Sequence, residues 1–154
     1  MKYMGTVTSK CGNKQYFISS EQTSMATGEN LWSKCCAIGG VPAMFATTAE
    51  FECFVGLFSM LPWKVIKDLD YFVDGYDMNL TRQFVTCPNH RPILDELWLG
   101  PNKFGVNFQP EVFEPNNIGG GERCVALYIR PGKFLGLADK YCTSSFKYIC
   151  QVTD

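Results

Sequence analysis

The amino-acid sequence predicts one α+β domain that is held together by disulfides. Two stretches have helical periodicity, several short runs are rich in β-branched and aromatic residues, and eight cysteines are scattered through 154 residues. A chain of this length can bury about 70 % of the surface that its unfolded form exposes. We expect an N-terminal extension over residues 1–10 and a single domain over residues 11–154.

The first helix is expected over residues 31–38, between the capping residue Asn30 and two glycines at 39 and 40. Trp32, Cys35 and Cys36 have i, i+3, i+4 spacing, which predicts that all three face inward.

The second helix is expected over residues 49–60, with Thr47 or Thr48 as its cap and Glu50 in its first turn. Four apolar residues share the face that we expect to be buried: Phe51, Phe54, Val55 and Phe58.

Strands are predicted where β-branched and aromatic residues concentrate. These runs are residues 11–20, 42–46, 69–75, 83–86, 124–130 and 146–152. Residues 88–121 are rich in proline and glycine, so they predict one long irregular loop, and such a loop within a domain is usually functional.

Composition excludes several classes of function. The net charge is −1, with 14 basic and 15 acidic residues, which argues against nucleic acid as the partner. One histidine, His90, cannot form a site that needs two, and we expect it on the surface. No apolar run is long enough to span a membrane. The chain has no nucleophile elbow and no phosphate-binding loop, so we expect no enzymatic activity.

The cysteines indicate an oxidising compartment. Their number is even and no pair has C-x-x-C spacing, which favours disulfides over a zinc or redox site. Asn79 begins an N-glycosylation sequon. The first ten residues lack the apolar core of a signal peptide. We therefore expect the mature form of a secreted glycoprotein.

Residues 114–142 carry the candidate chemistry. Glu114, Asn116, Glu122 and Asp139 offer carboxylate and amide oxygens, which calcium prefers as ligands. The glycines at 119–121 allow the chain to turn back, so that Glu122 approaches Glu114. These residues predict a calcium site, and the alternative is a solvated acidic loop.

The same segment resembles the C-terminal half of a C-type lectin-like domain. E-P-N at 114–116 is followed by Glu122, by Cys-Val at 124–125 and by Asp139 three residues before a cysteine. The first-helix cysteine and the start of the second helix are also similar, so the resemblance covers roughly residues 11–151. Its details resemble the single-domain lectins secreted by insects and other arthropods, of the E-P-N type.

The resemblance implies a fold of two helices packed on small antiparallel sheets, with a long irregular binding loop. It implies that Ca²⁺ and carbohydrate are both bound by Glu114, Asn116, Glu122 and Asp139. An E-P-N motif implies mannose-, glucose- or fucose-type sugars. This chain departs from the family at Leu137 and Ala138, which stand where the family has a packing Trp and a calcium-binding Asn.

The resemblance also implies disulfides. It joins Cys35, or its neighbour Cys36, to Cys150, and it joins Cys124 to Cys142. For the remaining cysteines we expect two further pairs, Cys11–Cys87 and Cys36–Cys53.

Two functions follow as hypotheses. The first is a secreted, calcium-dependent protein that binds glycans, with a role in innate immune recognition. The second is a non-enzymatic, calcium-independent module on the same scaffold, which binds a protein ligand or has a structural role. Ala138 and the aromatic-rich residues 104–113 motivate the second hypothesis.

Overall fold

The structure is a computed structural model that describes residues 5–19, 25–59, 69–77, 83–87, 90–94, 97–98, 121–130 and 134–153. Within them lie two helices, α1 (Leu31–Cys36) and α2 (Thr48–Ser59). The strands are β1 (Gly5–Cys11), β2 (Lys14–Ser19), β3 (Val41–Pro42), β4 (Leu69–Asp77), β5 (Phe84–Thr86), β6 (Arg91–Pro92), β7 (Cys124–Arg130), β8 (Phe134–Lys140) and β9 (Lys147–Thr153).

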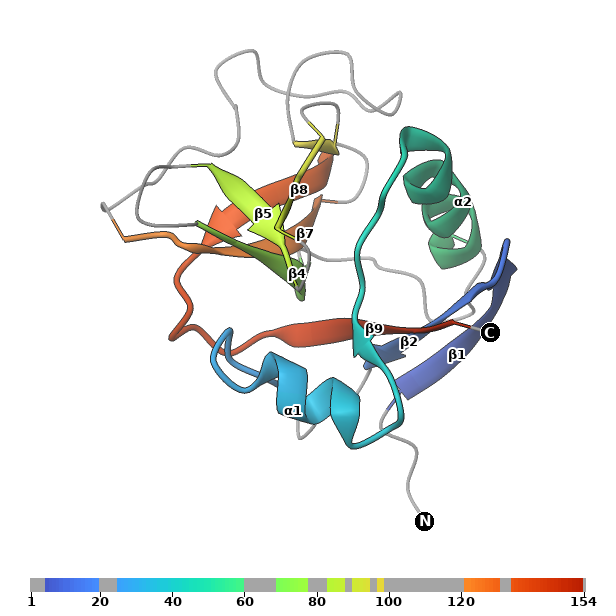
Figure 1. Ribbon diagram of the computed structural model, residues 1–154, viewed down its shortest axis with the longest axis horizontal. Coiled ribbons are helices and arrows are strands. Elements are labelled where there is room, and N and C mark those ends of the chain that lie inside the picture. Colours follow the sequence, from blue (N-terminus) through green and yellow to red (C-terminus); the bar gives the residue numbers. More distant parts are fainter. Residues whose placement is uncertain are drawn as a thin grey trace.

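Strand β9 connects the two parts of the sheet. It is antiparallel to β2 and β3 and parallel to β4. On one side β2 continues to β1, and on the other β4 continues to β7 and then β8. In Figure 1, β9 runs between α1 and α2, and its end lies beside the N-terminal hairpin. No helix among the described residues is long and apolar enough to cross a membrane.

Most predicted strands are present. The runs at 69–75, 83–86, 124–130 and 146–152 correspond to β4, β5, β7 and β9. Residues 42–46 supply only the second residue of β3. Three strands were not predicted. One of them, β1, contains residues 5–10, which the sequence analysis set apart as an extension, and it pairs with β2 from Gly5↔Ser19 to Cys11↔Lys14.

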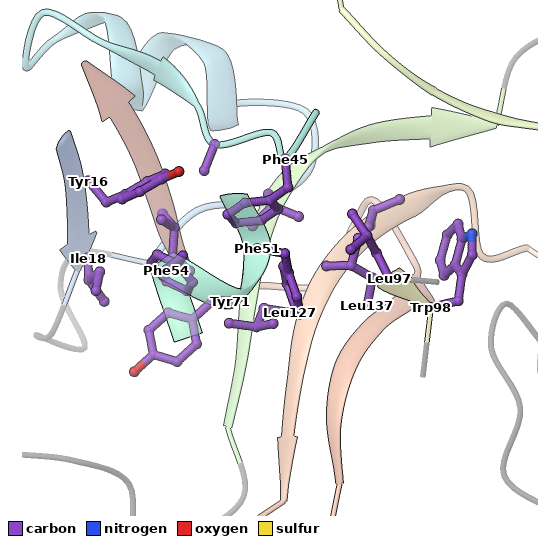
Figure 2. Close-up of a cluster of buried hydrophobic side chains, with 14 of the residues drawn as sticks. Tyr16, Ile18, Phe45, Phe51, Phe54, Tyr71, Leu97, Trp98, Leu127 and Leu137 are labelled. Atoms are coloured by element: carbon purple, nitrogen blue, oxygen red, sulfur yellow. The ribbon is translucent and has the colours of Figure 1, made fainter. Parts of the chain in front are cut away.

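Helix α2 confirms its prediction in the main. It begins at Thr48, and the hydroxyl of Thr47 accepts a hydrogen bond from the backbone N–H of Glu50 at 3.1 Å. Phe51 and Phe54 are fully buried. Figure 2 shows them with Phe45 between the hairpin side chains and those of the β7–β8 pair. The side chain of Phe58 lies outside the described part.

Helix α1 is shorter than predicted, and its inward face differs. Leu31 and Cys35 are buried, whereas Trp32 is 39 % exposed and Cys36 is exposed. The helix ends after six residues, so only one i, i+4 row packs on the second core cluster. The prediction that Trp32 and Cys36 face inward was wrong. Nor does the side chain of Asn30 cap α1, since its Oδ1 accepts a hydrogen bond from the N–H of Thr27 at 2.8 Å.

Two predicted disulfides are present, Cys35–Cys150 and Cys124–Cys142. Cys11 pairs with Cys53, so the predictions Cys11–Cys87 and Cys36–Cys53 were wrong. The reason is tertiary packing: α2 lies on β1, which brings these two Cα atoms to 6.1 Å. Cys36 on the outer face of α1 and Cys87 after β5 remain free thiols.

A partly buried ion pair joins the hairpin to α2. Lys14 of β2 is 9 % exposed, and its Nζ lies 2.8 Å from Oε1 of Glu50. The same ammonium donates to the carbonyl oxygen of Met44 at 2.9 Å, and Glu50 Oε1 also accepts from the N–H of Ala46 at 3.0 Å. The pair therefore fixes the turn that leads into α2.

We predict that Glu50→Gln lowers the free energy of unfolding by about 2 kcal/mol, because it leaves the buried Lys14 ammonium without its counter-charge. Urea unfolding followed by circular dichroism measures this. Glu52→Gln, at an exposed position of the same helix, is the matched control and should change stability by less than about 0.5 kcal/mol. Equal effects of the two substitutions would contradict the assignment.

Since two cysteines are not in disulfides, we predict that a thiol reagent titrates two thiols per chain in the absence of a reductant. Cys36 should react rapidly with a thiol reagent because it is exposed, and Cys87 more slowly because it is partly buried. Cys36→Ser should remove only the fast phase. A non-reduced peptide map that links Cys36 or Cys87 within one chain would disprove the pattern.

Candidate functional site

The structure describes two of the four predicted calcium ligands. Glu122 lies just before β7, and Asp139 lies near the end of β8. Glu114 and Asn116 are outside the described residues, as is the sequon residue Asn79. The geometry below therefore concerns the half of the candidate site that is built on β7 and β8.

Asp139 is held in place by the β7–β8 ladder, which runs without interruption from Cys124↔Lys140 to Arg130↔Phe134. Asp139 lies opposite Val125 and is only 1 % exposed. Directly opposed residues of antiparallel strands share a face, so its side chain lies on the same side as that of Val125. Val125 belongs to the first core cluster, which places the carboxylate at an edge of that core.

Ala138 lies opposite Ala126 and is fully buried. Since side chains alternate along a strand, it points to the other face from Asp139. An alanine has no polar side-chain atom, so this position supplies no side-chain ligand. Leu137, two residues before Asp139 in β8, lies on the same face of the strand as Asp139. It is buried in the first core cluster and forms an isolated parallel bridge with Trp98.

Glu122 is 8 % exposed and is fixed by its neighbours on both sides. The carbonyl oxygen of Arg123 accepts a hydrogen bond from the N–H of Asp77 at 2.9 Å, which ties this segment to the end of β4. A Cβ at Gly121 would lie 3.1 Å from the Tyr141 ring, so the chain passes close to the residue that follows β8. Glu122 and Asp139 are thus both anchored at the start of β7 and the end of β8.

The Cys124–Cys142 disulfide closes this end of the ladder. A Cβ at Gly28 would lie 2.5 Å from the sulfur of Cys124, so only glycine lets the segment before α1 pack against the bridge. The N–H of Gly28 donates to the carbonyl oxygen of Cys142 at 2.8 Å. The disulfide therefore limits movement of the backbone that carries both carboxylates.

Asp77, which the sequence analysis did not select, is a third buried carboxylate at this end. It is 2 % exposed and ends β4, and its backbone bonds to the residue after Glu122. Its position at the end of a strand in the run D-G-Y-D was the available signal. Buried carboxylates are unfavourable unless they are hydrogen-bonded or bind a cation.

Across the described ranges, no group of three or more His, Cys, Asp or Glu side chains is placed to hold a metal ion. Oxygen ligands from the segment that contains Glu114 and Asn116 would be needed to reach the six to eight that calcium prefers. The donor set that is described fits calcium in kind, because it consists of carboxylates. His90 is exposed, as predicted, and has a positive φ of 52°.

The chain is similar to several proteins of known structure. No family model and no curated protein matches the sequence. Three similar solved structures are the C-type lectin domain of murine dendritic cell inhibitory receptor 2 in complex with N-glycan, the C-type lectin CEL-I from Cucumaria echinata, and the cow C-type carbohydrate-recognition domain of CD23.

These structures align with nearly the whole chain. The murine domain has a TM-score of 0.66 at 22 % identity and covers 96 % of both chains. CEL-I has a TM-score of 0.65 at 14 % identity, over 95 % of this chain and 94 % of its own. The CD23 domain has a TM-score of 0.61 at 18 % identity, over 96 % and 93 %. The predicted fold class is confirmed, and the chain has the C-type lectin fold.

Proposed function

We propose that this protein is a calcium-dependent glycan-binding protein without catalytic activity. The observation that carries the proposal is the burial of Glu122 and Asp139 at one end of the β7–β8 ladder of a C-type lectin fold. Two strands and a disulfide fix the positions of both carboxylates, and Glu122 follows shortly after the E-P-N motif in the sequence.

In this proposal Glu114, Asn116, Glu122 and Asp139 bind the ion and orient the sugar. Calcium would supply a centre that accepts two neighbouring hydroxyls of a sugar. A carboxylate accepts a hydrogen bond from a hydroxyl, and the amide of Asn116 donates one. The E-P-N motif favours mannose-, glucose- or fucose-type sugars.

Ala138 weakens the site in a defined way. The family's fifth ligand is missing here, and a water molecule would occupy its coordination position. We expect weaker calcium binding and an affinity for single sugars of about millimolar, so that useful avidity needs several sites. The three disulfides support a secreted protein.

A second function is favoured by the same residue. Ala138 is buried opposite Ala126, where a polar side chain would have to displace core packing. A module that does not bind calcium would instead use the proline- and glycine-rich residues 88–121 to bind a protein. This alternative differs from the first in one measurable property, because its binding does not require calcium.

We predict that Asp139→Asn lowers calcium affinity at least tenfold, because it removes a charged ligand and keeps the shape and most hydrogen-bonding capacity of the side chain. Isothermal titration with CaCl₂, followed by mannose or fucose, measures both steps. Glu52→Gln on the exposed face of α2 removes the same charge elsewhere and should bind calcium as the wild type does.

The outcomes separate the two functions. Calcium binding that is lost in Asp139→Asn, together with a sugar response that disappears in EDTA, supports the lectin. Calcium binding without a response on a glycan array removes the sugar-binding half of the proposal. If the folded wild type binds no calcium, the calcium-independent module is favoured.

A further inference from the structure

Strand β4 carries a buried carboxyl group that the proposed calcium site does not use. Asp74 is 4 % exposed and lies two residues after Phe72 in β4. The backbone N–H of Cys87 donates to both of its oxygens, at 3.2 Å each. Among the residues that the structure describes, no Lys, Arg or His forms an ion pair with this carboxyl group.

Asp74 borders a cavity of about 280 Å³ beside α1. It is lined by residues of α1, of β4 and of the position after β5, among them Leu31, Trp32, Phe72, Asp74, Tyr76 and Cys87. Among the described residues that line it, none is basic. One of these residues, Trp32, is 39 % exposed, so the lining includes a side chain that reaches the surface.

The carboxyl group is unfavourable as an anion in this environment. Burial raises the pKa of Asp74 to about 7, although the N–H of Cys87 acts in the opposite direction. The titratable groups that face it are the thiol of Cys87 and the hydroxyl of Tyr76, and burial and nearby negative charge raise the pKa of both. A cation entering the cavity would supply the missing counter-charge.

We propose that this cavity binds a small organic amine, whose protonated amino group pairs with Asp74 while its apolar body packs against Trp32 and Phe72. Aromatic faces attract cations as well as apolar groups, which suits both parts of such a ligand. The volume is just below the usual range for ligand pockets of about 300–1,000 Å³. The ligand is therefore about the size of one aromatic ring with a short aminoalkyl chain.

This inference goes beyond glycan binding and does not depend on it. Neither Glu122 nor Asp139 lines the cavity, and no calcium is required. A titration that detects no calcium binding would contradict the lectin proposal but not the amine site. A titration that detects no amine binding would contradict the amine site but not the lectin proposal.

The state of the carboxyl group can be tested through stability. The native state holds the proton of Asp74 more tightly than the unfolded chain does, because the pKa of this carboxyl group is near 3.8 in the unfolded chain. This group therefore favours folding below about pH 4, and the contribution is lost as the pH rises to about 7. Relative to Asp74→Asn, the Tm of the wild type should fall by about 5–10 °C between pH 4 and pH 8. A Tm difference that does not vary with pH would show that the carboxyl group titrates normally.

Binding is tested with 2-phenylethylamine and with 3-phenylpropionate, which has a similar shape and the opposite charge. The protein carries Cys36→Ser, so that Cys87 is its remaining free thiol. We expect the amine to bind, to slow alkylation of Cys87, and to bind at least tenfold more weakly to Asp74→Asn. The carboxylate should bind at least tenfold more weakly than the amine to the unsubstituted site.

Asp74→Asn keeps an oxygen that can accept from the N–H of Cys87, and its circular dichroism spectrum and Tm serve as fold controls. If that variant does not fold, the affinities of the two probes for the Cys36→Ser protein, which keeps Asp74, still test the proposal. Equal affinity for both probes, undiminished amine binding in Asp74→Asn, or no amine binding would each overturn the proposal.

Discussion

The rest of the structure depends on the pairing of β9 with three other strands. Its antiparallel pairing with β2 completes the N-terminal part of the sheet, and its parallel pairing with β4 begins the part that carries the candidate sites. The Cys35–Cys150 disulfide fixes α1 to the same strand across a sequence separation of 115 residues. A long closed loop of this kind removes much of the entropy of the unfolded chain, about 4–5 kcal/mol on the loop-closure model.

Strand β4, which pairs with β9, helps to position both the proposed calcium site and the proposed amine site. Tyr71 and Val73 of β4 pack in the first core cluster, whereas Phe72 packs in the second. The antiparallel register with β7 then sets where Cys124 and Val125 lie, and the register of β7 with β8 sets where Asp139 lies. The position of the candidate calcium ligand therefore follows from two successive strand registers, and a slip of one residue in either would turn Asp139 to the other face.

The sequence predicted the elements whose local pattern agrees with their tertiary environment. Phe51 and Phe54 have helical spacing and are both buried, and the apolar run of β7 is a strand. Strand β8 was missed because its run contains a glycine and lacks a clear alternation. It is a strand because β7 offers it a continuous partner along all seven residues. Strand β1 was missed for a similar reason, since its polar run is ordered by β2.

The cysteines show the same limit. Family resemblance predicted the two pairs whose partners occupy positions typical of the fold. It offered no guide to Cys11 and Cys53, which meet because α2 packs on β1. For the candidate calcium site, too, the sequence predicts one part and tertiary structure determines another. Residue type and spacing select Glu122 and Asp139 as candidates, but their burial follows from the ladder that carries them.

The two kinds of buried carboxylate differ in what surrounds them, and this difference separates their roles. Asp139 lies on the first core's side of the β7–β8 ladder, and in the proposed site it acts together with other oxygen ligands. Asp74 lies in a cavity whose lining is mainly apolar, with one backbone N–H as its hydrogen-bond donor. Several carboxylates together suit a divalent ion, whereas one carboxylate among aromatic rings suits a monovalent organic cation. Cys124 lines this cavity, and its partner Cys142 follows Asp139 by three residues. The same disulfide therefore lies beside both proposed sites, whose chemistry differs.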